Sequence, residues 1–98
     1  MNWYVAEAVF NSIIDGAEDS YTPLIERSWF LVSADDESLA QAKAVALAEK
    51  RLDAYDNPAG ERVRWVFQRI ERLREVMDRE LQDGTEVWCE IEREGESQ

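Results

Sequence analysis

The sequence predicts an α+β fold. We expect a four-stranded antiparallel sheet, in the order β-β-α-β-β along the chain, with one long helix packed on one face. Two observations predict it. Each of the four tryptophans, Trp3, Trp29, Trp65 and Trp88, falls in a different segment with strand composition, and one large aromatic side chain per strand can build the core of a small sheet. Between the second and third of these segments lies an alanine-rich stretch typical of a helix. At 98 residues, the chain is expected to form a single domain over residues 1–98.

The first two strands are predicted over residues 2–14 and 24–34. Residues 2–14 are rich in aromatic and β-branched types and end at the turn signal Asp15-Gly16. Alternate residues of this segment form two faces, and both faces are largely apolar. This pattern is typical of a central strand or of a strand covered on its second face by a helix or another subunit. Residues 24–34 are expected to pair with it as a hairpin.

A helix is predicted over residues 35–56. Acidic residues at its start suit an N-cap and the first turn, because they complement the helix dipole. Alanines on one helical face would let the helix lie close to the sheet. Pro58 and Gly60 are expected to stop it, since proline disfavours helix in the residue before it and glycine supports a turn.

Residues 61–81 carry two competing patterns. Val63, Trp65 and Phe67 alternate as in a strand, whereas the apolar residues of the whole segment recur every three or four positions as in an amphipathic helix. Residues 85–93 alternate again and are predicted as the last strand. The polar residues 94–98 are expected to be a frayed tail.

Four pieces of the sequence carry a family resemblance. In order and spacing, the chain resembles the uncharacterised bacterial family called domain of unknown function 4288 in WYVAEAVF, ADDESLAQAKAVAL, YDNPAGERVRWVF and LQDGTEVW. The similarity covers most of residues 2–92. It implies a strand over 61–68, and a short helix around 70–81 is the alternative for the residues that follow. The family has no assigned activity, so the resemblance implies no catalytic residue.

The residue types argue against an enzyme. The chain has no histidine, which removes the commonest general base and metal ligand at neutral pH. The lone Cys89 alternates with Val87 and Ile91, a pattern typical of a small buried thiol. Neighbouring acids occur in a predicted loop, at the helix start and on a strand face, namely Glu18/Asp19, Asp35/Asp36/Glu37 and Glu90/Glu92. Acids in such places are normally solvated or capping, so we predict no catalytic, metal or cofactor site.

Charge and hydropathy limit the partners. The formal charge is −11, although residues 62–79 hold six arginines against three acids. An acidic body repels phosphate backbones, so direct nucleic-acid binding is not expected. The chain starts without the basic region of a secretion signal, contains no apolar run long enough to span a membrane, and has one cysteine. These features predict a cytoplasmic protein with no membrane association.

Two groups of residues are candidates for contacts. Arg62 and Arg64 would project from the face opposite Val63, where they would either bind an anionic ligand or pair with acids of the chain itself. Trp88 shares a strand face with Glu90 and Glu92, and a partly exposed tryptophan among polar residues is a contact hot spot. We therefore single out Trp88, Arg62, Arg64, Glu90 and Glu92 as interaction residues.

The leading functional hypothesis is a non-enzymatic protein-interaction domain that associates with itself, as a dimer. One helix covers one face of a four-stranded sheet, so the other face must be polar or must meet a partner. An alternative is an acidic inhibitor or immunity-type protein that binds a basic partner. A second alternative is a binder of small anionic ligands that uses the strand face of Arg62 and Arg64.

Overall fold

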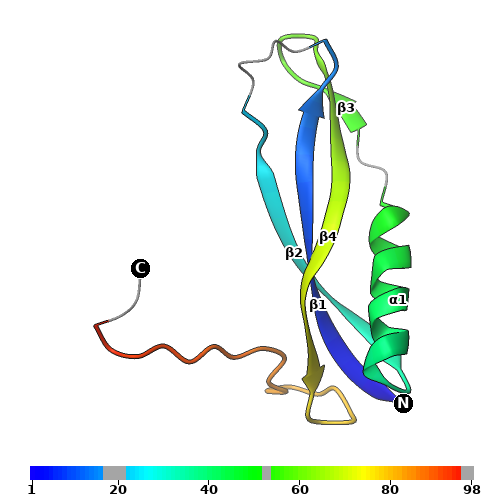
Figure 1. Cartoon of the computed structure of the whole chain (residues 1–98), viewed down its shortest axis with the longest axis vertical. Coiled ribbons are helices and arrows are strands. Elements are labelled where there is room, and N and C mark those ends of the chain that lie inside the picture. Colours follow the sequence, from blue (N-terminus) through cyan, green and yellow to red (C-terminus); the bar gives the residue numbers. More distant parts are fainter. Residues whose placement is uncertain (17–21, 52–53, 96–98) are drawn as a thin grey trace.

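The computed structural model describes residues 1–16, 22–51 and 54–95, and these form an α+β fold (Figure 1). Three long antiparallel strands make the sheet, and a three-residue strand extends it. The described elements are β1 (Asn2–Ile14), β2 (Ile25–Ala34), α1 (Glu37–Glu49), β3 (Ala54–Asp56) and β4 (Arg62–Val76). The strand order across the sheet is β2-β1-β4-β3. The predicted α+β class with one helix is therefore confirmed for the described residues, whereas the predicted membership of the sheet is wrong, as shown below.

Strand β1 is central, as its composition predicts. It pairs with β2 in an unbroken register from Asn2↔Ala34 to Asn11↔Ile25, and with β4 on its other side. All residues from Tyr4 to Phe10 are buried. Because successive side chains of a strand point to opposite faces, this burial means that both faces of β1 are covered.

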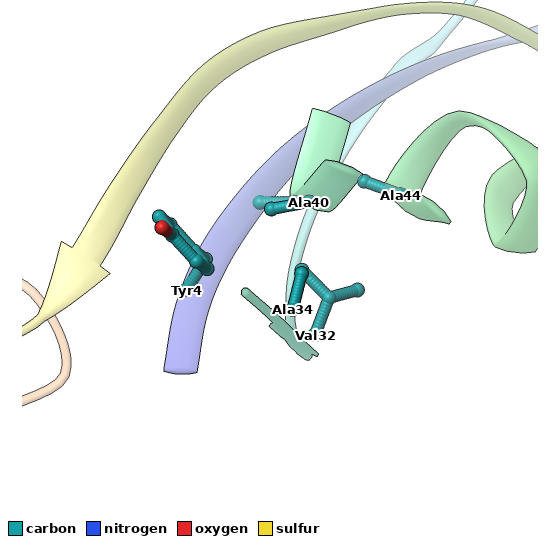
Figure 2. Packing of buried hydrophobic residues seen from close by; sticks show 6 residues of the cluster. Tyr4, Val32, Ala34, Ala40 and Ala44 are labelled. Carbon is teal, nitrogen blue, oxygen red and sulfur yellow. The ribbon is translucent and has the colours of Figure 1, made fainter. Parts of the chain in front are cut away.

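Helix α1 packs on one face of the sheet through a row of small residues. Ala40, Ala44 and Ala48 recur every four positions and are buried. Ala40 and Ala44 belong to one cluster with Tyr4 of β1 and with Val32 and Ala34 of β2, and Figure 2 shows Ala40 lying between Tyr4 and Ala44. Small side chains at i, i+4 spacing allow the helix backbone to approach the strands closely. Val9, Glu7 and Val5 point to the opposite face, which α1 does not cover.

The helix is shorter than the predicted range 35–56. Asp36 is the N-cap, and its Oδ1 accepts a hydrogen bond of 2.8 Å from the backbone N–H of Leu39. The helix ends at Glu49. Its last predicted turn instead forms β3, which pairs with the beginning of β4 around the turn Asn57–Gly60. Gly60 has φ +82°, a value that glycine adopts readily, so this turn competes with continuation of the helix.

The short helix around 70–81, which was the alternative for these residues, does not form. Strand β4 instead continues to Val76. Two β-bulges explain the ambiguous pattern. Ala8 pairs with Ile70 and Phe10 with Phe67, which leaves Gln68 as an extra residue; a second register shift leaves Glu71 as another. Each bulge changes the spacing of residues on one face from two to three. Phe67, Ile70 and Leu73 therefore all pack towards α1, at a spacing that also fits a helix.

The predicted last strand over residues 85–93 does not form. Residues 77–95 contain turns and extended chain but no strand. After the end of β4, this segment runs along the side of the sheet opposite α1 (Figure 1). Side chains of β4 hold this segment over the sheet face rather than at its edge: Arg74 Nη1 donates a hydrogen bond to the carbonyl of Cys89. Cys89 is consequently exposed, so its predicted burial is wrong.

The remaining sequence predictions concern an acidic pair, the C-terminal tail and membrane spans. The acidic pair Glu18/Asp19 and residues 96–98 of the predicted tail lie outside the described residues. Glu94 and Gly95 lie in a turn and are exposed. Among the described residues, no helix has both the length and the apolar character needed to cross a membrane.

Candidate interaction surface

The sheet face opposite α1, called the open face below, carries a row of charged residues across its centre. Residues of one face are identified by register, because paired residues of neighbouring strands project to the same side. The central part of the open face consists of Val5, Glu7 and Val9 of β1, Leu31, Trp29 and Arg27 of β2, and Arg74, Arg72 and Arg69 of β4. Trp88 and Glu90 from the C-terminal segment complete it.

Glu7 is the buried centre of the open face, with a relative exposure of 1 %. Its Oε2 accepts a hydrogen bond of 3.2 Å from Arg27 Nη1, and its Oε1 accepts one of 2.5 Å from Arg72 Nε. The hydrogen bond from Arg72 lowers the pKa of Glu7 and outweighs burial, which acts in the opposite direction. Glu7 is therefore a carboxylate held between two strands by arginines of both neighbours.

The pairing continues outward as an alternating series of charges. Arg27 also approaches Glu71 at 3.5 Å, and Glu71 pairs with Arg69 at 2.7 Å. On the other side, Arg72 Nη1 lies 2.5 Å from Glu90 Oε1, and the pKa of Arg72 is raised by its two carboxylate partners. The central arginines of the open face are thus bound to the protein's own acids.

Trp88 attaches the C-terminal segment to this series. The guanidinium carbons of Arg72 and Arg74 lie 4.9 Å and 4.4 Å from the centre of its ring, a cation–π geometry. Its indole Nε1 donates a 3.2 Å hydrogen bond to Glu90. The pKa of Glu90 is lowered, chiefly by the hydrogen bond from Arg72. One aromatic ring and one carboxylate therefore hold the segment against β4.

An apolar groove runs beside Trp88. It has a volume of about 430 Å³ and is lined by Val5, Trp29, Val87, Trp88, Cys89 and Glu90. Trp29 is 49 % exposed and Leu31 is 39 % exposed, although both belong to the sheet. Beyond the groove, Ile91 is 95 % exposed. The open face therefore joins a polar centre to an apolar flank on β2.

The five predicted interaction residues fall into separate places. Trp88 and Glu90 meet on the open face, while Glu92 is exposed further along the segment. Arg62 and Arg64 lie at the far end of β4. Arg64 donates to Asp15 Oδ1 from Nε (3.1 Å) and Nη2 (2.9 Å), and Arg62 Nη1 lies 3.5 Å from Asp56. Both arginines thus have acids of the chain itself as partners.

Sequence reasoning missed Glu7 and Trp29 as site residues. Glu7 has a recognisable signal, since it is the single charged residue within the apolar run Trp3–Phe10. A charge inside a buried strand requires a partner, and residues 62–79 supply the arginines. The exposure of Trp29 has no such signal, because it depends on β2 lying at the edge of the sheet.

Within residues 1–16, 22–51 and 54–95, no group of three or more His, Cys, Asp or Glu side chains has the arrangement of a metal site.

Among protein families, the model described as "Domain of unknown function (DUF4288)" matches residues 3–89, which confirms the resemblance found in the sequence. No curated protein and no solved structure matches the chain.

Proposed function

The chain belongs to the DUF4288 family of domains of unknown function, and we propose that it is a non-enzymatic protein-interaction domain that associates with a second copy of itself. Self-association accounts for a surface that is larger than a compact domain of this length exposes and that includes large apolar side chains.

The observation that carries the proposal is the area exposed by one chain. The accessible surface is 7410 Å², whereas a compact monomer of 11.4 kDa exposes about 5,800 Å². The radius of gyration is 17.0 Å, against about 13 Å for a compact chain of this length. The excess of about 1,600 Å² per chain is about twice the 800 Å² that each partner contributes to a standard protein–protein interface.

Most of the large exposed apolar side chains lie on β2, on Leu24 just before it, and on the C-terminal segment. Leu24, Ile25 and Trp29 are 64 %, 64 % and 49 % exposed, and Val87 and Ile91 are 45 % and 95 % exposed. Trp29 and Val87 line one groove, and exposed apolar patches mark interaction sites. An interface between two copies would remove them from water.

The acidic-inhibitor alternative draws on a different feature. Arg27, Arg69 and Arg72 of the open face each have a carboxylate partner, and the chain as a whole carries a formal charge of −11. A basic protein would be attracted to that negative charge. The anionic-ligand alternative requires a ligand that displaces Asp15 from Arg64 and Asp56 from Arg62. A cytoplasmic location stays a prediction, to which the free thiol of Cys89 adds support.

The test is sedimentation velocity of the purified chain over a wide concentration range. Self-association predicts a concentration-dependent dimer with a dissociation constant of about 10 µM or below, a strength reached by interfaces of standard size. A single species of monomer mass up to about 100 µM, far above such a constant, would contradict the proposal and leave the two alternatives.

A further inference from the structure

We infer that two copies associate through strand β2, which pairs antiparallel with β2 of the second copy and joins the two sheets into one. The inference rests on the proposed self-association and names its surface. A two-fold axis across β2 would present the same strand from both copies, which is the usual arrangement of a closed dimer.

The outer edge of β2 has no strand partner among the described residues, although at its C-terminal end the carbonyl of Ser33 accepts a hydrogen bond of 2.8 Å from Lys43 Nζ. Strand β2 is at one end of the order β2-β1-β4-β3, and no described segment pairs with its outer edge. The backbone N–H of Ser12 donates to the carbonyl of Leu24 at 3.0 Å, and the register from Asn2↔Ala34 to Asn11↔Ile25 runs without a shift. Even-numbered residues of β2 therefore bond to β1, and odd-numbered ones direct their N–H and C=O groups outward. The outward positions are Ile25, Arg27, Trp29, Leu31 and Ser33.

The two edges of the sheet differ in how they resist pairing. Beyond β3, strand β4 carries the two bulges at Gln68 and Glu71 and a high density of arginine and glutamate. Bulges and charges are features by which proteins block edge-to-edge association. Strand β2 has neither a bulge nor a proline, and its central residues, Trp29 to Val32, are all apolar. An edge of that length and composition is suited to strand pairing.

Charge favours a second copy over a basic partner at this edge. Strand β2 contains one acid and one base, although the whole chain carries −11. Glu26 lies 2.5 Å from Arg51, and Arg27 lies 3.2 Å from Glu7, so both charges are neutralised within the protomer. The strand therefore offers no field that would attract a cationic surface, and it does not repel an identical strand.

Size and apolarity point to the same occupant. Beside the free edge of β2, the side chains of Ile25, Trp29 and Leu31 project from the open face and are 64 %, 49 % and 39 % exposed. A second β2 brings the same side chains, so each copy covers the other's apolar residues while their main chains pair. The interface would use about 800 Å² from each copy, which the excess area of each chain supplies.

A proline substitution tests the backbone pairing. Leu31→Pro removes an outward N–H that β1 does not use, and an edge strand tolerates proline at such a position. Leu31→Ala is the matched control, because it removes the side chain but keeps the N–H. We expect sedimentation to show a dissociation constant raised at least about 30-fold by Leu31→Pro but about 3-fold by Leu31→Ala, in line with loss of pairing in the first case alone. Circular dichroism verifies that both variants are folded.

Cysteine cross-linking gives a second measurement that does not depend on proline being tolerated. In a Cys89→Ser background, Ile25→Cys, Trp29→Cys and Ser33→Cys place thiols along β2, and Gln68→Cys places one on β4. Mild oxidation should link two copies through at least one β2 position, the one nearest the two-fold axis, and not through Gln68→Cys.

The outcomes separate this inference from the proposed function. A wild-type chain that stays monomeric overturns self-association itself. A wild-type dimer that persists in Leu31→Pro, or that cross-links through Gln68→Cys rather than β2, leaves self-association standing and overturns the assignment to β2.

Discussion

At the scale of single residues, Glu7 connects stability to the open face. Its carboxylate is buried and bonded to Arg27 and Arg72, whose side chains are 44 % and 39 % exposed. Because both partners reach water, removal of the carboxylate leaves two arginines that can be solvated. The energetic loss is therefore smaller than for a fully buried ion pair.

We predict that Glu7→Gln lowers the free energy of unfolding by about 1–2 kcal/mol, because the amide keeps the shape but not the charge-assisted hydrogen bonds. Glu7→Ala should lower it by about 2–3 kcal/mol, since it also leaves unfilled space in the sheet. Urea unfolding measures both. Glu75→Gln, an exposed position on β4, is the control and should change stability by less than about 0.5 kcal/mol. Equal losses for Glu7→Gln and Glu75→Gln would contradict the role given to Glu7.

The pH dependence follows from the same carboxylate. Folding lowers the pKa of Glu7, so the folded protein holds the ionised form more strongly than the unfolded chain does. The stabilisation is fully present above the unfolded pKa of about 4.3 and is lost as the pH falls through the lower folded pKa. The melting temperatures of wild type and Glu7→Gln should therefore differ at pH 7 and converge towards pH 3. A difference that stays constant over that range would exclude this linkage.

At the scale of elements, β4 shows how a strand can imitate a helix. Its two bulges place Phe67, Ile70 and Leu73 on the face towards α1 at three-residue spacing. The same spacing produces an amphipathic helical pattern, and no local signal tells a bulge from a helical turn. Pairing with β1, a long-range interaction, decides between them.

A deletion experiment tests this explanation of β4. Deleting Gln68 removes one bulge but leaves one residue between Phe67 and Ile70, so the apolar side chains keep their face. We expect a loss of about 1 kcal/mol. Deleting both Gln68 and Arg69 puts Phe67 and Ile70 on opposite faces and should prevent stable folding, because a one-residue slip inverts all following side chains. Thermal unfolding monitored by circular dichroism measures both variants. Similar stability of the two deletions would contradict the assignment of the bulge.

The elements that sequence predicts well are those fixed by local patterns. Strands β1 and β2 and their hairpin follow from composition and turn residues, and α1 follows from Asp36 and its alanines. The end of α1 and the absence of a strand over residues 85–93 depend on distant partners. The alternation around Trp88 is typical of a strand, but its ring binds Arg72 and Arg74 on the sheet face, and no rule based on neighbouring residues contains that contact.

At the scale of the whole molecule, the charge of −11 acts on any association. Two identical acidic chains repel each other, and the repulsion reaches over the Debye length, which is about 14 Å at 50 mM salt and about 4 Å at 500 mM. The edge of β2 proposed as the interface carries no net charge. This edge contributes apolar contacts and backbone hydrogen bonds to the association, and salt screens neither.

Salt should therefore strengthen the dimer. Raising sodium chloride from about 50 mM to about 500 mM is expected to lower the dissociation constant of the self-associated form by about 3- to 10-fold, because repulsion is screened while the apolar contact persists. Sedimentation of the wild-type chain at both salt concentrations measures the change. A complex with a basic protein would weaken over the same range, since its attraction is electrostatic. A self-association that weakens as salt rises would instead show that ion pairs hold the interface, contrary to the apolar edge of β2.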